Sequence, residues 1–269
     1  MEKRTGHLQE QKAHWDIFFD LHDVLAYVSA VGKNYESYLA KVLAPAGVTR
    51  GEAINIHGEA FKRWIGEFRR LTDGLEGDDS SPESFMDRMR EIDRKWEDFV
   101  LGSVSLENRE VIAPQLNTSK LEYEALAEGP YPVLYPEVKG VLERLKEIDS
   151  LSLYIASSAS SHHVRGVVAL HGLAGYFKKL IGYDTVEAPK KSPSGQYFKK
   201  MLTITGADPF CSIFVGDTIE EATLATKSGM KFVMVQRNQQ SLENRVKTIK
   251  FDVVRNLTEF LAVISDYIE

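Results

Sequence analysis

The sequence contains a single cysteine, Cys211, among its 269 residues. One cysteine excludes a disulfide within the chain, and free thiols are typical of a reducing compartment. We therefore expect a cytoplasmic protein in which Cys211 is a small buried hydrophobic residue and not a nucleophile.

Long apolar runs and an excess of basic charge are also missing. No stretch approaches the ~18 apolar residues of a membrane span, and the polar start MEKRTGHLQEQKAH lacks the apolar segment of a signal peptide. The 39 acidic side chains outnumber the 33 basic ones, and the sequence shows no basic stripe of the kind that binds the phosphate backbone of a nucleic acid. We expect residues 1–14 to be a flexible N-terminus, and we expect neither a membrane nor a nucleic-acid partner.

The second half of the chain alternates short apolar runs with helical patterns. This alternation predicts a doubly wound, Rossmann-like parallel sheet in an α/β fold. One helix is expected to open at Ser192 and Pro193, and another follows Thr218. The predicted strands are 151–157, 178–184, 211–217, 231–235 and 251–254.

An earlier strand ends on a charge. Ile17, Phe18 and Phe19 are consecutive apolar residues, which is typical of a parallel strand covered on both faces. Asp20 follows them directly. Because ligands bind at the carboxyl edge of such sheets, Asp20 is expected to meet a ligand or a metal.

Residues 29–130 contain helical patterns with almost no strand signal. Thr49 and Glu52 have capping-box spacing, and aromatic residues such as Phe61 and Trp96 recur at helical spacing, for which we expect core packing in preference to a ligand pocket. We interpret 29–130 as an all-helical cap inserted into a core formed by 15–28 and 131–269. Hinges are expected near 27–32 and 129–132, and the cap is expected to act as a lid over the sheet edge.

Polar residues end four of the predicted strands. Each group alone has an ordinary explanation, such as helix capping or surface decoration. Together, carboxylates, hydroxyls and ammonium groups are expected to converge on one edge of the sheet. They are Asp20 with His22, Ser157 with Ser158, Lys190 with Lys191 at the start of a helix, and Asp217 with Glu220 and Glu221.

These motifs resemble those of the haloacid dehalogenase superfamily, in the helical-cap branch of the phosphoglycolate phosphatases and β-phosphoglucomutase-like proteins. FFDLHDVL resembles the family's Asp-x-Asp-x-Thr/Val motif except at the second aspartate. YIAS, PKKSP and VGDTIEE resemble its serine/threonine, lysine and Gly-Asp-x-x-x-Asp/Glu motifs. The resemblance runs from about residue 16 to the final helix.

The resemblance implies a Mg2+-dependent hydrolase of a small phosphorylated metabolite. Asp20 would be the nucleophile that forms an aspartyl-phosphate, and Asp217 would hold Mg2+, with Glu221 as a ligand or an outer partner. Ser157, or alternatively Ser158, would bind the phosphoryl group. Lys190 would neutralise charge, with Lys191 as the alternative.

His22 departs from the family pattern. Its backbone carbonyl would still bind the metal, and imidazole can serve as acid or base near neutral pH. The neutral form, favoured beside Mg2+ and Lys190, cannot donate a proton as aspartic acid does. The alternatives are a catalytically impaired relative that binds phosphorylated metabolites and, less favoured, a metal-independent dehalogenase. The oligomeric state stays open.

Overall fold

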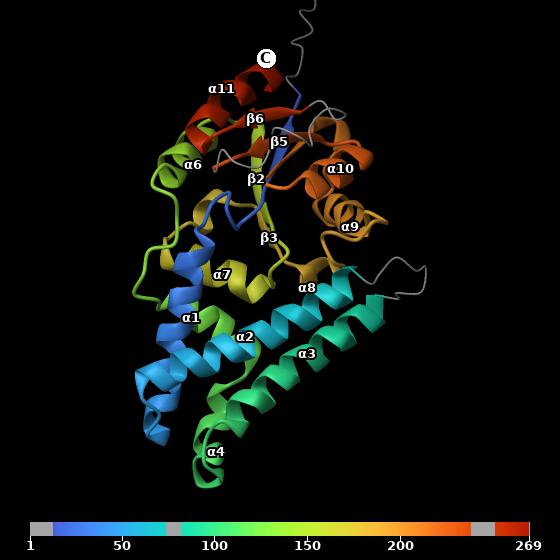
Figure 1. Cartoon of the computed structure of the whole chain (residues 1–269). Coiled ribbons are helices and arrows are strands. Elements are labelled where there is room, and N and C mark those ends of the chain that lie inside the picture. Colours follow the sequence, from blue (N-terminus) through green and yellow to red (C-terminus); the bar gives the residue numbers. More distant parts are fainter. Residues whose placement is uncertain (1–12, 74–81, 238–250, 269) are drawn as a thin grey trace, which may run out of the picture.

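The computed structural model describes residues 13–73, 82–237 and 251–268. Its centre is a parallel sheet with the strand order β3-β2-β1-β4-β5-β6 (Figure 1). The chain winds outward from β1 in both directions, which confirms the doubly wound α/β fold. The strands are β1 (Trp15–Phe19), β2 (Leu151–Ala156), β3 (Lys179–Ile181), β4 (Ser212–Gly216), β5 (Lys231–Val235) and β6 (Asp252–Val254).

Both faces of the sheet are covered by helices. Ile17 and Phe19 point into an apolar cluster with α6, α7 and α11, whereas Phe18 between them points into a second cluster with α9 and α10. In Figure 1, α6 and α11 lie left of the sheet and α9 and α10 lie right of it. The consecutive apolar residues of β1 therefore have the two-sided burial predicted for them. These helices are α6 (Val138–Lys146), α7 (Ser161–Leu170), α9 (Gln196–Thr205), α10 (Ile219–Lys227) and α11 (Leu257–Ile268).

In the described part of the chain, five of the six α-helices between β1 and β2 lie outside the layers that flank the sheet, and only α6 packs against it. These five helices extend beyond the carboxyl edge of the sheet (Figure 1). Three-residue 3-10 turns follow α1 and α4. The helices are α1 (Val28–Leu43), α2 (Arg50–Asp73), α3 (Pro82–Gly102), α4 (Leu106–Ile112) and α5 (Thr118–Ala127).

The inserted helices have an apolar core of their own. Trp96 and Val100 of α3 pack with Leu39 of α1 and Leu121 of α5. The predicted role of Phe61 was wrong: its side chain is 50 % exposed. The buried apolar residues of α2 are Ala53, Ala60 and Leu71, and Trp64 is partly buried against the same cluster.

The inserted helices also contact the sheet domain directly. Leu126 of α5 belongs to the same apolar cluster as the α7 valines. A Cβ atom on Gly166 of α7 would lie only 2.8 Å from Leu126 Cβ, so α5 and α7 cross at very short distance. Tyr183, in the short helix α8 (Tyr183–Val186), packs with Phe85 and Met89 of α3. The two parts are thus docked at two places.

The two connections between the parts run side by side. The Tyr27 amide donates to the Val133 carbonyl at 2.7 Å, and the Tyr135 amide donates to the Leu25 carbonyl at 3.0 Å. The buried Asn34 side chain accepts from the Tyr131 amide at 3.0 Å and donates to its carbonyl at 2.9 Å.

Some element boundaries differ from those predicted. The helix expected at Ser192 begins only at Gln196, after Gly195 adopts the left-handed conformation with φ 65°. Lys190 and Lys191 therefore lie in a turn, and the prediction that they enter a helix was wrong. The strand predicted for 178–184 ends at Ile181, because Gly182 caps α8 with its amide bonded to Thr185. Of the predicted flexible N-terminus, residues 1–12 lie outside the described residues.

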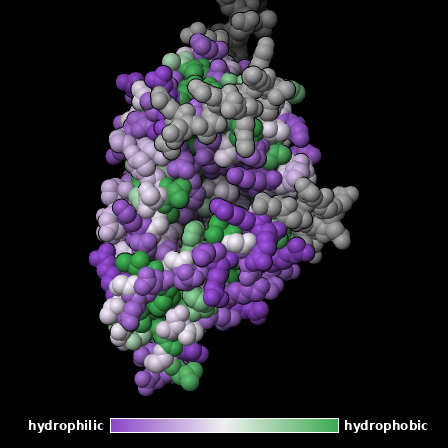
Figure 2. All heavy atoms as spheres, viewed as in Figure 1, coloured by the Kyte–Doolittle hydropathy of each residue, from purple (hydrophilic) through white to green (hydrophobic). Residues whose placement is uncertain are grey.

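The surface mixes hydrophilic and hydrophobic side chains. Figure 2 shows hydrophilic residues dominating along α3, with hydrophobic ones interspersed at the lower left, over the inserted helices. In α4, Leu106 and Val111 are exposed. Among the described residues, no helix has both the length and the apolar character needed to cross a membrane.

Candidate active site

Asp20 and Lys190 form a buried ion pair at the carboxyl end of β1. Lys190 Nζ lies 2.7 Å from Asp20 Oδ1 and 2.7 Å from Glu221 Oε1. The Leu21 amide donates to the same Asp20 oxygen at 2.8 Å, which fixes the carboxylate beyond the strand. Both carboxylates and the ammonium are almost fully shielded from solvent, so one lysine is shared by two acids.

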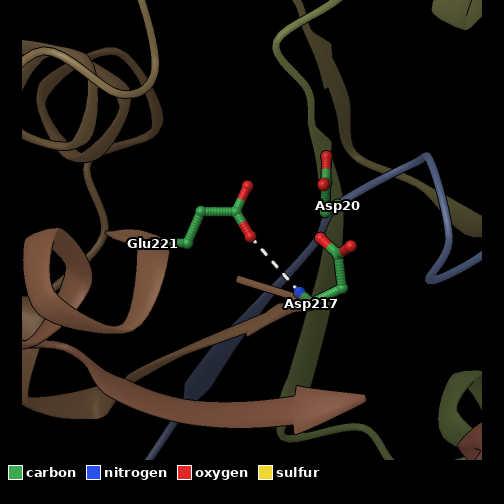
Figure 3. A group of neighbouring side chains, drawn as sticks. All are labelled: Asp20, Asp217 and Glu221. Atoms are coloured by element: carbon green, nitrogen blue, oxygen red, sulfur yellow. Dashed lines mark hydrogen bonds between the residues drawn. The ribbon is translucent and has the colours of Figure 1, made fainter. Parts of the chain in front are cut away.

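Asp217 and Glu221 come from the end of β4 and the first turn of α10. Thr218 caps this helix by accepting from the Glu221 amide at 3.3 Å. Glu221 reaches back so that its Oε2 accepts from the Asp217 amide at 3.3 Å, as Figure 3 shows. Asp20, Asp217 and Glu221 each offer an oxygen, and the three oxygens lie within 4.8 Å of one another.

The carboxylate cluster contains more acidic groups than basic ones. Burial raises the pKa of Asp20 to about 8 despite the attraction of Lys190, and burial together with the charge of Glu221 raises the pKa of Asp217 to about 7. Burial acts to lower the pKa of Lys190, but its two carboxylate partners outweigh that effect and raise it. Three acids against one ammonium favour a further positive charge. Hard carboxylate oxygens in this arrangement fit Mg2+.

The serine and lysine alternatives differ in their surroundings. Ser157 is fully buried beyond β2, the strand beside β1, and its hydroxyl accepts from the Ala159 amide at 3.1 Å. Ser158, one residue further, is half-buried. Lys190 is buried in the ion pair described above, whereas Lys191 is exposed.

His22 contacts a residue that sequence reasoning missed. Its Nε2 lies 2.9 Å from Nε2 of His163 in the first turn of α7, and Nδ1 of His163 lies 2.9 Å from the hydroxyl of Tyr35 in α1. Burial lowers the pKa of His22 to about 4, with Lys190 adding to the effect, and burial lowers that of His163 well below its usual value. Burial thus favours the neutral form of both imidazoles.

The loop after Asp20 is held by an arginine that sequence reasoning did not identify. Asp23 adopts the left-handed conformation with φ 56°, and its carbonyl accepts from Arg237 Nε at 3.0 Å. Arg237 also donates to the Val24 carbonyl at 2.6 Å and pairs with Glu137 at 2.8 Å. A lone arginine after β5 carries no motif that would have revealed this role.

The model of the haloacid dehalogenase-like hydrolase family matches residues 98–235. The chain belongs to this family. The matched range of the haloacid dehalogenase-like chain contains Ser157, Lys190, Asp217 and Glu221, while Asp20 and His22 precede it.

Curated relatives of this haloacid dehalogenase-like hydrolase include phosphoglycolate phosphatases. That of Aquifex aeolicus is 28% identical over 116 residues, which are 43% of this chain and 53% of the relative. That of Haemophilus influenzae (strain 86-028NP) is 31% identical over 100 residues, which are 37% of this chain and 43% of the relative. The chain thus spans about half the length of the curated relatives it matches.

Solved structures share the fold along nearly the whole chain. A Bacillus subtilis protein described as a HAD-type hydrolase bound to magnesium gives a TM-score of 0.60 at 16% identity, covering 94% of this chain and 99% of its own. The L-2-haloacid dehalogenase of Xanthobacter autotrophicus gives 0.57 at 14%, covering 94% and 98%. Identities this low establish the fold alone, and phosphatases and dehalogenases share it.

Proposed function

We propose that this hydrolase is a Mg2+-dependent phosphatase of a small phosphorylated metabolite, with Asp20 as the nucleophile. The observation that carries the proposal is the buried cluster of Asp20, Asp217 and Glu221 around Lys190. Phosphoryl transfer requires an aligned nucleophile and positive charge around the phosphoryl oxygens. The cluster contains the nucleophile, Asp20, and its carboxylates attract positive charge.

In the first step, a carboxylate oxygen of Asp20 attacks phosphorus, and the bond from phosphorus to the leaving oxygen breaks. Lys190 stabilises the charge that develops on the transferring group, and the Ser157 hydroxyl, with Ser158 as the alternative, binds a phosphoryl oxygen. Mg2+, held by Asp20, Asp217 and the His22 carbonyl with Glu221 as ligand or outer partner, would supply further positive charge there. The product is an aspartyl-phosphate on Asp20 and a leaving oxygen that needs a proton.

In the second step, His22 acts as the general base. Its neutral imidazole accepts a proton from the water that attacks the aspartyl-phosphate, and the Asp20 carboxylate leaves. The same neutral imidazole is a poor acid for the first step. We therefore expect aryl phosphates, whose leaving groups need no protonation, to react faster than alkyl phosphates.

Residues 29–130 act in this proposal as a lid, with 15–28 and 131–269 forming the catalytic core. The paired connections at Tyr27 with Val133 and at Leu25 with Tyr135 support a common hinge. A lid of this size excludes water from the reaction and admits small substrates. The curated relatives make phosphoglycolate the first substrate to test.

A screen of phosphorylated metabolites with and without Mg2+ tests the function, with Asp20→Asn as the blank. Phosphate release that requires Mg2+ and disappears in Asp20→Asn is the expected result. Chloride release from 2-chloropropionate without a metal would favour a dehalogenase instead. Binding of phosphoglycolate without turnover would show an impaired relative.

The role of His22 is tested by His22→Asp. Aspartate restores an acid for the leaving group, so turnover of phosphoglycolate should rise by about 10²–10⁴-fold. Turnover of p-nitrophenyl phosphate should change much less. A His22→Asp variant slower than wild type on both substrates would contradict this division of roles.

A further inference from the structure

The loop that follows the nucleophile is closed by its own backbone. The Leu21 carbonyl accepts from the amides of Leu25 at 2.9 Å and Ala26 at 2.8 Å, and the Asp23 amide donates to the Ala26 carbonyl at 2.8 Å. The Asp23 amide belongs to the same peptide group as the His22 carbonyl. In the part of the chain that the structure describes, no donor bonds to the His22 carbonyl itself, so this oxygen is available to a metal.

Two further carbonyls of this loop converge on Arg237, the second residue after β5. Arg237 Nε donates to the Asp23 carbonyl at 3.0 Å, and Nη2 donates to the Val24 carbonyl at 2.6 Å. A guanidinium only donates and a carbonyl only accepts, so both bonds have a single possible direction. The guanidinium thus holds two successive peptide groups that directly follow the one with the His22 carbonyl.

The guanidinium of Arg237 is itself fixed on two other sides. Its Nη1 donates to Glu137 Oε1 at 2.8 Å, and the same oxygen accepts from the Leu257 amide at the start of α11 at 3.4 Å. The guanidinium carbon lies 3.4 Å from the centre of the Tyr135 ring. Only 13 % of the Arg237 side chain and 20 % of the Glu137 side chain are exposed. Arg237 therefore reaches the loop from a position that the sheet domain determines.

We propose that Arg237 is a positioning residue for the metal site. By binding the Asp23 and Val24 carbonyls, it sets the place of the preceding His22 carbonyl, a proposed Mg2+ ligand, relative to Asp20. Asp23 needs such support because its φ of 56° is in the left-handed region, which is costly for a residue with a side chain. The inference rests on the proposed function, since it concerns a ligand of the proposed Mg2+ site.

Three variants separate the contacts of Arg237. Arg237→Met keeps most of the side-chain length and removes every donor. Arg237→Lys keeps the charge, but a single ammonium cannot replace the planar fork at two carbonyls and a carboxylate. Glu137→Gln is the matched control, because its amide oxygen can still accept from Arg237 although the ion pair is lost. The bonds from Arg237 to Asp23 and Val24 are therefore retained in the control.

Calorimetric titration with Mg2+, at a temperature at which circular dichroism shows each protein to be folded, measures the metal site without turnover. We expect Arg237→Met and Arg237→Lys to bind Mg2+ about 10–100-fold more weakly than wild type, as is typical when an outer partner of a metal ligand is lost. Glu137→Gln should bind nearly as tightly as wild type. Its melting temperature should nevertheless fall, as should that of Arg237→Met, because both lose the largely buried ion pair.

Affinity that falls in step with melting temperature in all three variants would show that Arg237 only stabilises the fold, and would overturn the inference. Wild-type affinity in Arg237→Met would overturn it as well and leave the phosphatase proposal intact. If Arg237→Met does not fold, Arg237→Lys is judged by the same criteria. Absence of Mg2+ binding by wild type would refute the Mg2+-dependent phosphatase, and the role of Arg237 at its metal site with it.

Hydrogen exchange of the metal-free proteins gives a second readout, followed by mass spectrometry of peptides that cover 20–27. The amides of Leu25 and Ala26 should exchange faster in both Arg237 variants than in Glu137→Gln, while the amides of β2 exchange at the same rate in all of them. Loop exchange that is equal in Arg237→Met and Glu137→Gln would contradict a specific hold of Arg237 on the loop.

Discussion

Gly166 lies where α7 crosses α5, and a methyl group there is expected to push the two helices apart. A Cβ atom on Gly166 would lie 2.8 Å from the Cβ of Leu126 and 2.8 Å from the carbonyl oxygen of Tyr123. Both atoms are held by the α5 backbone, so neither can move without the helix. Gly166→Ala therefore tests whether the inserted helices are docked on the sheet domain.

Two opposing effects determine how Gly166→Ala changes the free energy of unfolding. Alanine in place of glycine in a helix stabilises by about 0.5–1 kcal/mol, whereas overpacking at a close contact costs about 1–3 kcal/mol. Gly140 of α6 provides the control, because it is exposed and a Cβ there meets nothing within 4 Å. Gly140→Ala should therefore gain the helix stabilisation of alanine without any overpacking. Gly166→Ala should therefore be less stable than Gly140→Ala by about 1–3 kcal/mol.

Urea unfolding of both variants and of wild type, followed by far-ultraviolet circular dichroism, gives the comparison. In thermal unfolding, the same gap corresponds to about 2–4 °C for each kcal/mol in a chain of this size. If both glycine-to-alanine variants are stabilised equally, α5 does not press on α7 at Gly166. The docked arrangement of the inserted helices would then be wrong.

Three further predictions concern charged groups. Asp217→Asn should weaken Mg2+ binding in calorimetry by more than the ~10–100-fold typical of losing an outer partner, and unchanged affinity would contradict its role as a ligand. Lys190→Met should lower the free energy of unfolding by about 3–5 kcal/mol at pH 7, because Asp20 and Glu221 lose their shared counter-charge. An exposed ion pair contributes only about 1 kcal/mol or less. A loss of stability below that value would therefore argue against a buried triad. Burial raises the pKa of Glu122 from 4.5 to about 8. Between these pH values the folded state therefore binds more protons than the unfolded state. The free energy of unfolding falls as pH rises through this window, by at most about 1.4 kcal/mol per pH unit. Glu122→Gln should remove this dependence and be more stable than wild type at pH 8 but not at pH 5, and parallel stability curves would refute the assignment.

The sheet and its polar edge could be predicted from the sequence because they depend on local patterns. Consecutive apolar residues such as Ile17–Phe19 mark a strand covered on both faces, and strand ends in a parallel sheet meet at one edge. Asp20 and Asp217 could therefore be placed together from the strand pattern alone. Thr218 was also foreseeable as the start of α10, since an N-cap threonine is a local signal.

Contacts between distant segments could not be predicted in the same way. His163 stands beside His162 in the sequence, and nothing local indicates that one of them meets His22 while the other does not. Phe61 fits a helical stripe, but its exposure depends on how closely α2 approaches its neighbours. The late start of α9 depends on the left-handed Gly195, which overrides the capping signal of Ser192 and Pro193.

The position of the insertion has a consequence for the order of folding. β1 is the inner strand between β2 and β4, yet residues 20–150 are synthesised before β2 begins. During synthesis, the apolar strand that carries the nucleophile therefore waits for both of its partners, while α1–α5 can form their own local contacts first. The nascent chain is expected to depend on protection of residues 15–19 until β2 emerges, because an unpaired apolar strand is prone to aggregation.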